Sequence, residues 1–61
     1  MLTITIDTSN AAFEADWTIE VTRILRELTV ALTHGPINAG RGGKLRDING
    51  NTVGAWRWEL P

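Results

Sequence analysis

The chain has 61 residues, a formal net charge of −1, no cysteine and a single histidine, His34. A chain this short forms one domain with a small core and is marginally stable unless a disulfide, a metal or a partner supports it. Disulfides and thiolate metal sites are excluded, and one histidine makes a poor zinc site. We therefore expect residues 1–61 to form a single domain, without metal or cofactor, that is stabilised by self-association.

Charge divides the chain into two parts. Residues 1–34 carry five acidic and two basic side chains, whereas residues 35–61 carry two acidic and four basic ones. A net charge near zero gives no general attraction to nucleic acid or anionic membranes, but a dipolar chain can pair with copies of itself. No apolar run is long enough to span a membrane, and the N-terminus does not have the pattern of a signal peptide, so we expect a cytoplasmic protein.

The first expected element is a strand. Leu2 to Ile6 alternates aliphatic and hydroxyl residues, which predicts a half-buried strand with its three aliphatic side chains facing the core. Asp7 to Asn10 is a run of turn-forming residues that ends the strand. We expect Ala11 to Phe13 to form a short turn that places Phe13 under the sheet.

Trp17 to Thr33 is expected to form the one helix. Asp16 is a good N-cap, and Gly35 followed by Pro36 ends the helix. Helical spacing puts the apolar residues on one stripe. Its members are Trp17, Val21, Ile24, Leu25, Leu28 and Leu32, with Ala31 at the edge.

Pro36 to Gly43 is glycine-rich and predicts a loop. The backbone amides of Gly40 to Lys44 could hold an anion, with Arg41 and Lys44 as charged partners. The segment does not fit a Walker A loop, which needs G-x-x-x-x-G-K-[ST] between a strand and a helix. A linker is the favoured interpretation.

Leu45 to Leu60 predicts a β-hairpin. Asp47 to Gly50 fits a type I turn that closes with a bulge, and a two-residue turn at Asn49 and Gly50 is the alternative. The first register pairs Leu45 with Val53 and is preferred because it places apolar residues opposite one another. The second register pairs Leu45 with Gly54. The preferred register puts Leu45, Val53 and Ala55 on one face and Thr52, Gly54, Trp56 and Trp58 on the other.

The element order β-α-β-β predicts an α+β fold. We expect the helix to pack on one face of a three-stranded, mainly antiparallel sheet with the last strand in the middle. The opposite face stays bare, and a second copy is expected to bury Trp56 and Trp58 there, because aromatic residues are enriched at interface centres. One alternative is a bulge near Gly54 that turns one indole into the core. Another is a tryptophan pair that stacks on nucleic-acid bases.

Ile19 and Val30 lie on the outer face of the expected helix, on the same side as Arg23 and Arg26. Isolated exposed aliphatic residues are common, and that is the simpler interpretation. Together these four residues could bind a partner. The expected interface residues are thus Trp56, Trp58, Thr52, Ile19 and Val30.

The sequence shows no catalytic constellation, so we expect no enzymatic activity. Asp7, Glu14 and Asp16 cluster before the helix, where they suit turn and cap positions. His34 falls at the helix C-terminus, where the helix dipole favours a cation. Nothing places Ser9, the only serine, beside His34.

Three segments resemble a group of small uncharacterised proteins encoded by bacteriophages and prophages. They are ITIDTSNAAFE at 4–14, VTRILREL at 21–28 and LRDINGNTVG at 45–54. Proteins of that group typically show ITIDT-x-NAAF, A-R-I-L-R-E-L and LRD-x-NGN-x-VG. This chain departs from the pattern with Thr22 in place of the alanine and with its tryptophan-rich C-terminus. The resemblance implies no activity, only a phage setting in which small proteins often bind and block a host protein.

We therefore expect a non-enzymatic phage accessory protein in the host cytoplasm. It would act as a homo-oligomer, with a dimer favoured, by binding another protein such as a host defence component. The alternative is a small nucleic-acid-binding module with salt-dependent affinity. That module would use Arg41, Lys44, Arg46 and Arg57. A third, minor alternative is nucleotide binding by the glycine-rich loop.

Overall fold

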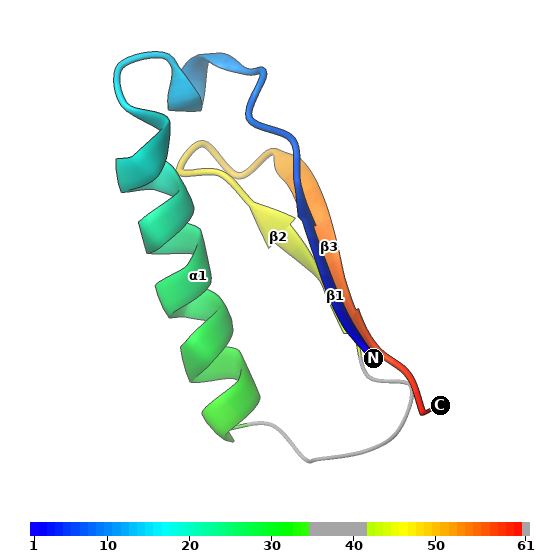
Figure 1. The fold of residues 1–61 in the computed structure, drawn as a ribbon. Helices are drawn as coiled ribbons and strands as arrows, with labels where there is room; N and C mark the ends of the chain where they lie inside the picture. The colour runs from blue at the N-terminus through cyan, green and yellow to red at the C-terminus, as the bar shows by residue number, and fades with distance from the viewer. Residues whose placement is uncertain (35–41, 61) are drawn as a thin grey trace.

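The structure is a computed structural model that describes residues 1–34 and 42–60. The described elements, in chain order, are β1 (Leu2–Ile6), a short 3₁₀ helix η1 (Ala11–Phe13), α1 (Trp17–His34), β2 (Gly42–Arg46) and β3 (Thr52–Trp58). The helix packs against one face of a three-stranded antiparallel sheet (Figure 1). The predicted α+β fold is thus confirmed.

The strand order is β1-β3-β2, so the last strand is central, as predicted. Ile4 pairs with Trp56, and Ile6 pairs with Gly54. Paired residues of antiparallel strands share a face of the sheet. The aliphatic side chains of β1 therefore lie on the face that carries the helix, as predicted, but Leu2 and Ile4 are exposed and only Ile6 packs against the core, so the predicted half-burial of all three is wrong.

The hairpin turn is the one preferred from the sequence. The backbone N–H of Gly50 donates to the carbonyl of Asp47 (3.0 Å), and the N–H of Asp47 donates to the carbonyl of Asn51 (2.9 Å). Gly50 has a φ of +85°, a conformation that glycine adopts without the steric cost of a Cβ. The predicted turn over Asp47 to Gly50 is confirmed.

Beyond the turn, the predicted register is wrong. Arg46 pairs with Thr52 as expected, but Leu45 pairs with Gly54 and not with Val53. Val53 is thus an extra residue in β3, and an inserted residue of this kind is a β-bulge. Because side chains alternate with a period of two, the bulge reverses the face of every later residue in β3.

The bulge turns both tryptophans of β3 towards the helix. Trp56 is only 7% exposed, and Trp58 is half-buried against the same core. The prediction that they lie on the bare face with Thr52 is wrong, and so is the placement of Ala55 in the core, since Ala55 is exposed. The alternative, a bulge that brings an indole into the core, is confirmed. The buried apolar residues are Phe13, Ile24, Leu28, Leu45, Val53 and Trp56.

Phe13 and Trp56 explain how so short a chain builds a core. Each aromatic side chain buries roughly 150–250 Å², more than any aliphatic residue of the chain can offer. Gly43 pairs with Trp56 across the sheet, and a Cβ at Gly43 would come within 2.8 Å of the indole Nε1. The ring of Trp56 therefore lies close over a position that has no side chain.

The helix begins as predicted but its buried stripe differs. The N–H of Thr18 donates to the carboxylate of the N-cap residue Asp16 (2.9 Å). Trp17 and Leu25, both predicted to face the core, are exposed. Trp17 is the first residue of α1, at the end of the helix. Arg23 bonds to Arg46 of β2, and helical spacing puts Leu25 on the other side of the buried stripe from Arg23, away from β2. Glu20 takes a buried position instead.

The predicted loop over Pro36 to Gly43 is wrong at its end, because Gly42 and Gly43 are the first residues of β2. Gly42 to Lys44 is therefore extended strand, which corrects the idea of an anion-binding loop in this part. The rest of that loop, with Arg41 and the helix stop at Gly35 and Pro36, lies outside the described residues.

Substitution of Gly54 tests the close approach of β1 to the bulge. A Cβ at Gly54 would lie 1.8 Å from the backbone oxygen of Thr5. Gly54→Ala should therefore destabilise the fold by roughly 3 kcal/mol, the upper end of the cost of overpacking, or prevent folding. Urea unfolding followed by far-UV circular dichroism measures the effect.

The matched control is Gly50→Ala, where a Cβ meets nothing within 4 Å and only the positive φ is unfavourable. It should cost about 1–2 kcal/mol. If Gly54→Ala is no more destabilising than this control, β1 does not approach Gly54 as closely as the structure shows.

Candidate interaction surfaces

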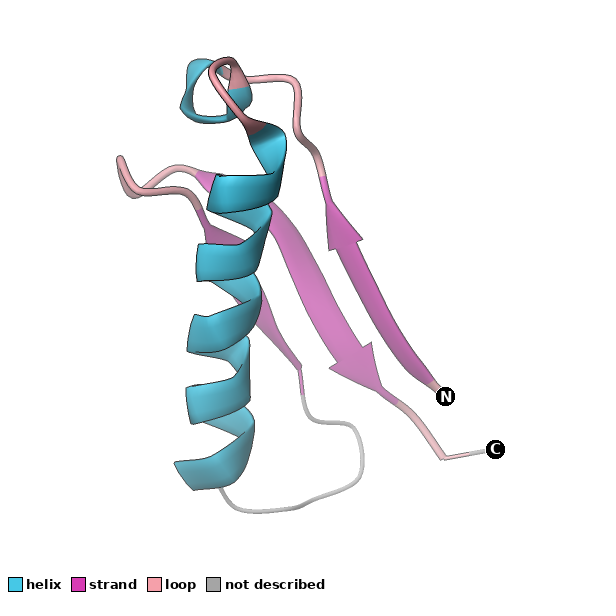
Figure 2. Cartoon of the chain, turned by 60° about the vertical axis from the view of Figure 1, so that its left-hand side comes forward, coloured by secondary structure: helices cyan, strands magenta, loops and turns pink. Residues whose placement is uncertain are grey.

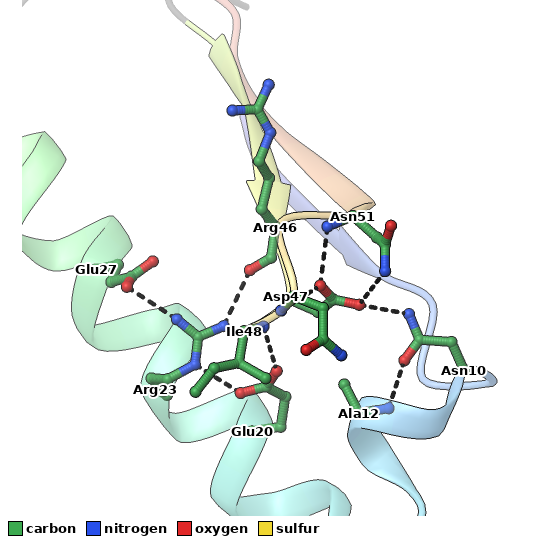
Figure 3. Close-up of polar contacts among 10 residues, drawn as sticks. Asn10, Ala12, Glu20, Arg23, Glu27, Arg46, Asp47, Ile48 and Asn51 are labelled. Atoms are coloured by element: carbon green, nitrogen blue, oxygen red, sulfur yellow. Dashed lines mark hydrogen bonds and ion pairs between the residues drawn. The ribbon is translucent and has the colours of Figure 1, made fainter.

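Segments from both ends of the chain meet in a polar cluster around the carboxylate of Asp47, which is only 4% exposed. The carboxylate accepts hydrogen bonds from the side chain of Asn10 (2.7 Å), from the backbone and side chain of Asn51 (2.9 and 3.2 Å) and from the backbone of Asn49 (2.9 Å). Figure 3 shows Asn10 reaching Asp47 from the segment after β1. Asp47 therefore joins the hairpin turn to the segment that follows β1.

Glu20 joins the helix to the same turn. Its buried carboxylate accepts hydrogen bonds from Nε of Arg23 (2.6 Å) and from the backbone N–H of Ile48 (2.8 Å). Arg23 also donates to Glu27 (2.8 Å) and to the carbonyl of Arg46 (3.1 Å), as Figure 3 shows. The guanidinium thus bridges α1 and the end of β2.

The environment of these carboxylates favours their ionised form. For Asp47, burial raises the pKa, but the hydrogen bonds from Asn51, Asn10 and Asn49 together outweigh it, so the pKa is lowered from its ordinary value of 3.8. For Glu20, the hydrogen bond from Arg23 is the largest influence and lowers the pKa against the effect of burial.

The buried polar groups of this cluster are all satisfied within the chain. Across residues 1–34 and 42–60, every buried side-chain nitrogen and oxygen has a hydrogen-bond partner. A fully hydrogen-bonded network of this kind fixes the positions of the segments that it joins. We therefore assign Asp47, Glu20 and Arg23 a structural role.

The carboxylates near the helix start have the turn and cap roles expected of them. Asp7 accepts a hydrogen bond from the N–H of Ser9 (2.9 Å), and Asp16 caps α1. His34 is exposed at the last residue of α1. In the part of the chain that the structure describes, no three His, Cys, Asp or Glu side chains gather as a metal site would require.

The first candidate surface is the sheet face that the helix does not cover. Register places Thr5, Ala55 and Lys44 in one row and Thr3 and Arg57 in the next. They line a shallow depression together with Gly42 and Glu59, and Glu59 forms a 3.5 Å ion pair with Arg57. Of the predicted ligand-binding residues, the structure thus brings Lys44 and Arg57 to one depression.

Arg46 and Thr52 pair with each other near the turn, outside this depression, and Arg41 is not among the described residues. The indole of Trp56 lies on the opposite face of the sheet, so it cannot stack a base beside Arg57. The predicted placement of Arg57 on the face away from the tryptophans is confirmed.

The second candidate surface is the outer face of α1. Ile19 and Val30 are both exposed, as the sequence predicts. Ile19 borders a shallow hollow with Thr18, Thr22, Arg23, Arg26 and Glu27. Val30 lies beyond this hollow, so the two aliphatic residues do not form one continuous site.

The third candidate surface, which we call the β1 surface, consists of the outer edge of β1 and the side chains of Leu2, Ile4 and Leu25. These side chains are 47%, 40% and 39% exposed, although they lie on the helix-facing side of the molecule. In Figure 2 the helix passes in front of β2 and the beginning of β3, and β1 lies farther to the side. A helix is about 10 Å wide and strands are about 4.8 Å apart, so one helix covers about two strands.

The β1 surface does not follow from the sequence, because period-two alternation shows which side chains share a face but not whether anything covers that face. The sequence does predict one helix and three strands, and one helix is too narrow to cover three strands. Comparisons of the chain with protein-family models, with curated proteins and with solved structures found no match. No helix in the described ranges is long and apolar enough to cross a membrane.

The lowered carboxyl pKa values predict sensitivity to acid. A carboxyl whose pKa is lower in the folded than in the unfolded state stabilises the fold above its unfolded pKa, and this stabilisation is lost as the pH falls through the lowered value. For Asp47 and Glu20, the urea midpoint should be constant above about pH 5 and should fall below about pH 4.

Asp47→Asn tests the larger cluster, because an amide cannot accept as many hydrogen bonds as a carboxylate. The variant should have a lower midpoint than the natural chain at pH 7 and a smaller further decrease at pH 3. Glu14→Gln, a charge change at an exposed position outside the cluster, is the control. Equal pH dependence in the natural chain and Asp47→Asn would contradict the role assigned to Asp47.

Proposed function

We propose that this chain is a non-enzymatic protein-binding module that self-associates through the β1 surface. The observation that carries the proposal is an unprotected strand edge beside exposed aliphatic side chains. The resemblance of the chain to small phage and prophage proteins supports a further role in binding a host protein.

The edge of β1 lacks the features that keep proteins monomeric. Natural sheets protect exposed edges with charged residues, proline, bulges or a covering segment. β1 has the sequence LTITI, and in the described structure its only strand neighbour is β3. Its residues also have high β-propensity, which favours pairing with another strand.

The hydrogen-bond pattern shows which backbone groups face outward. The N–H of Asp7 donates to Val53 (2.8 Å) at one end of β1, and the N–H of Glu59 donates to Met1 (3.1 Å) at the other. Inward and outward groups alternate along an antiparallel strand. The odd-numbered residues of β1 therefore bond to β3, and the N–H and C=O groups of Leu2, Ile4 and Ile6 point away from the sheet.

Size measurement by light scattering tests the proposal. The natural chain should have at least twice the 6.7 kDa mass of one chain at micromolar concentration. Ile4→Lys puts a charge on the β1 surface at a half-exposed position, so it should give a folded monomer. Far-UV circular dichroism checks that the variant remains folded.

The matched control is Val30→Lys, which puts the same charge on the exposed outer face of α1. It should keep the mass of the natural chain. A monomeric natural chain, or a folded Ile4→Lys variant of unchanged mass, would refute the proposal. Dissociation by Val30→Lys alone would move the contact to the outer helix face.

A second candidate function is nucleic-acid binding by the uncovered sheet face, favoured by the shared depression of Lys44 and Arg57. Phosphate contacts make affinity fall steeply with salt. Binding to DNA or RNA should be visible at low salt and weakened by the double substitution Lys44→Gln and Arg57→Gln, but not by Arg26→Gln on the helix. No binding at low salt would remove this candidate.

A further inference from the structure

We infer that the partner at the β1 surface is a second copy, and that two β1 strands pair antiparallel about a two-fold axis through Ile4. The two three-stranded sheets then form one continuous sheet with both helices on the same face. This inference rests on the proposed self-association and adds its geometry.

The register follows from the outward backbone groups. A hydrogen-bonded pair in an antiparallel ladder needs outward groups on both residues. With the axis at Ile4, Ile4 pairs with Ile4 of the second copy, and Leu2 pairs with Ile6. This register uses every outward residue of Leu2–Ile6. A shift of the axis to Thr3 or Thr5 leaves one outward residue of each strand unpaired.

The same register matches the side chains. On the helix-facing side, aliphatic residues meet aliphatic residues, so the exposed Leu2 of one copy lies beside Ile6 of the other. On the opposite side, Thr3 meets Thr5, and threonine pairs across strands are favourable. β1 carries no charged side chain, so no like charges oppose each other.

Cysteine cross-linking tests the register, because the natural chain has no cysteine to interfere. Thr3 and Thr5 are exposed and would form a non-hydrogen-bonded pair across the axis, with Cα atoms about 4.5 Å apart, within disulfide range. Thr3 of one copy lies about 8 Å from Thr3 of the other, beyond that range, and the same holds for Thr5.

The experiment uses Thr3→Cys labelled with ¹⁵N and unlabelled Thr5→Cys, oxidised with glutathione disulfide separately and as an equal mixture. Mass spectrometry then separates mixed from like dimers. We expect the mixture to give mainly the mixed disulfide, and each variant alone to stay mostly uncross-linked. Light scattering of both reduced variants checks that they still associate.

Each other result overturns the inference in a distinguishable way. Efficient cross-linking of Thr3→Cys alone, or of Thr5→Cys alone, would move the axis to that residue. Equal amounts of mixed and like dimers would indicate random collision. Association without any cross-link would refute this strand pairing but not self-association through the β1 surface, which Ile4→Lys tests separately, whereas monomers would refute both.

Discussion

The extra residue Val53 in β3 determines where the side chains of the last strand point. Because the bulge reverses the alternation after Val53, Trp56 enters the core and Trp58 packs against it. The core of so short a chain depends on the buried area of those rings. The same reversal places Arg57 on the uncovered face and removes the indoles of Trp56 and Trp58 from it. The surfaces that the sheet leaves for partners are therefore the uncovered face with Lys44 and Arg57 and the β1 surface, not a pair of indoles.

The bulge lies next to the polar cluster at the hairpin turn. Asp47 holds the turn through Asn49 and Asn51 and ties it to Asn10, so these hydrogen bonds fix the turn from which β3 begins. Glu20 links this turn to the helix. Buried carboxylates are costly unless their hydrogen bonds are satisfied, and here they are. The segment after β1, the helix and the hairpin turn are thus held together by one set of hydrogen bonds.

Local sequence chemistry predicts the elements, their order and the turn, because each depends on neighbouring residues: LTITI for β1, Asp16 for the helix start and Asp47 with Gly50 for the turn. The faces of β3 could not be derived in this way. A glycine within a strand often marks a bulge, so Gly54 indicated the alternative with an indole in the core, but it does not decide between the two registers. The pairing of Leu45 with Gly54, a contact between strands, decides it. The exposure of Leu25 depends on which strands the helix covers, which is a property of the packed molecule and not of the helix.

The central claim is that β1, and not the tryptophan pair, forms the contact between copies. Residue-resolved amide hydrogen exchange by NMR at increasing protein concentration tests it most directly. Thr3 and Thr5 bond to β3 within one chain, so their amides should be protected at every concentration. The amides of Leu2, Ile4 and Ile6 should become protected only as the chain associates. If these three amides still exchange freely when light scattering shows an assembled protein, the claim is contradicted.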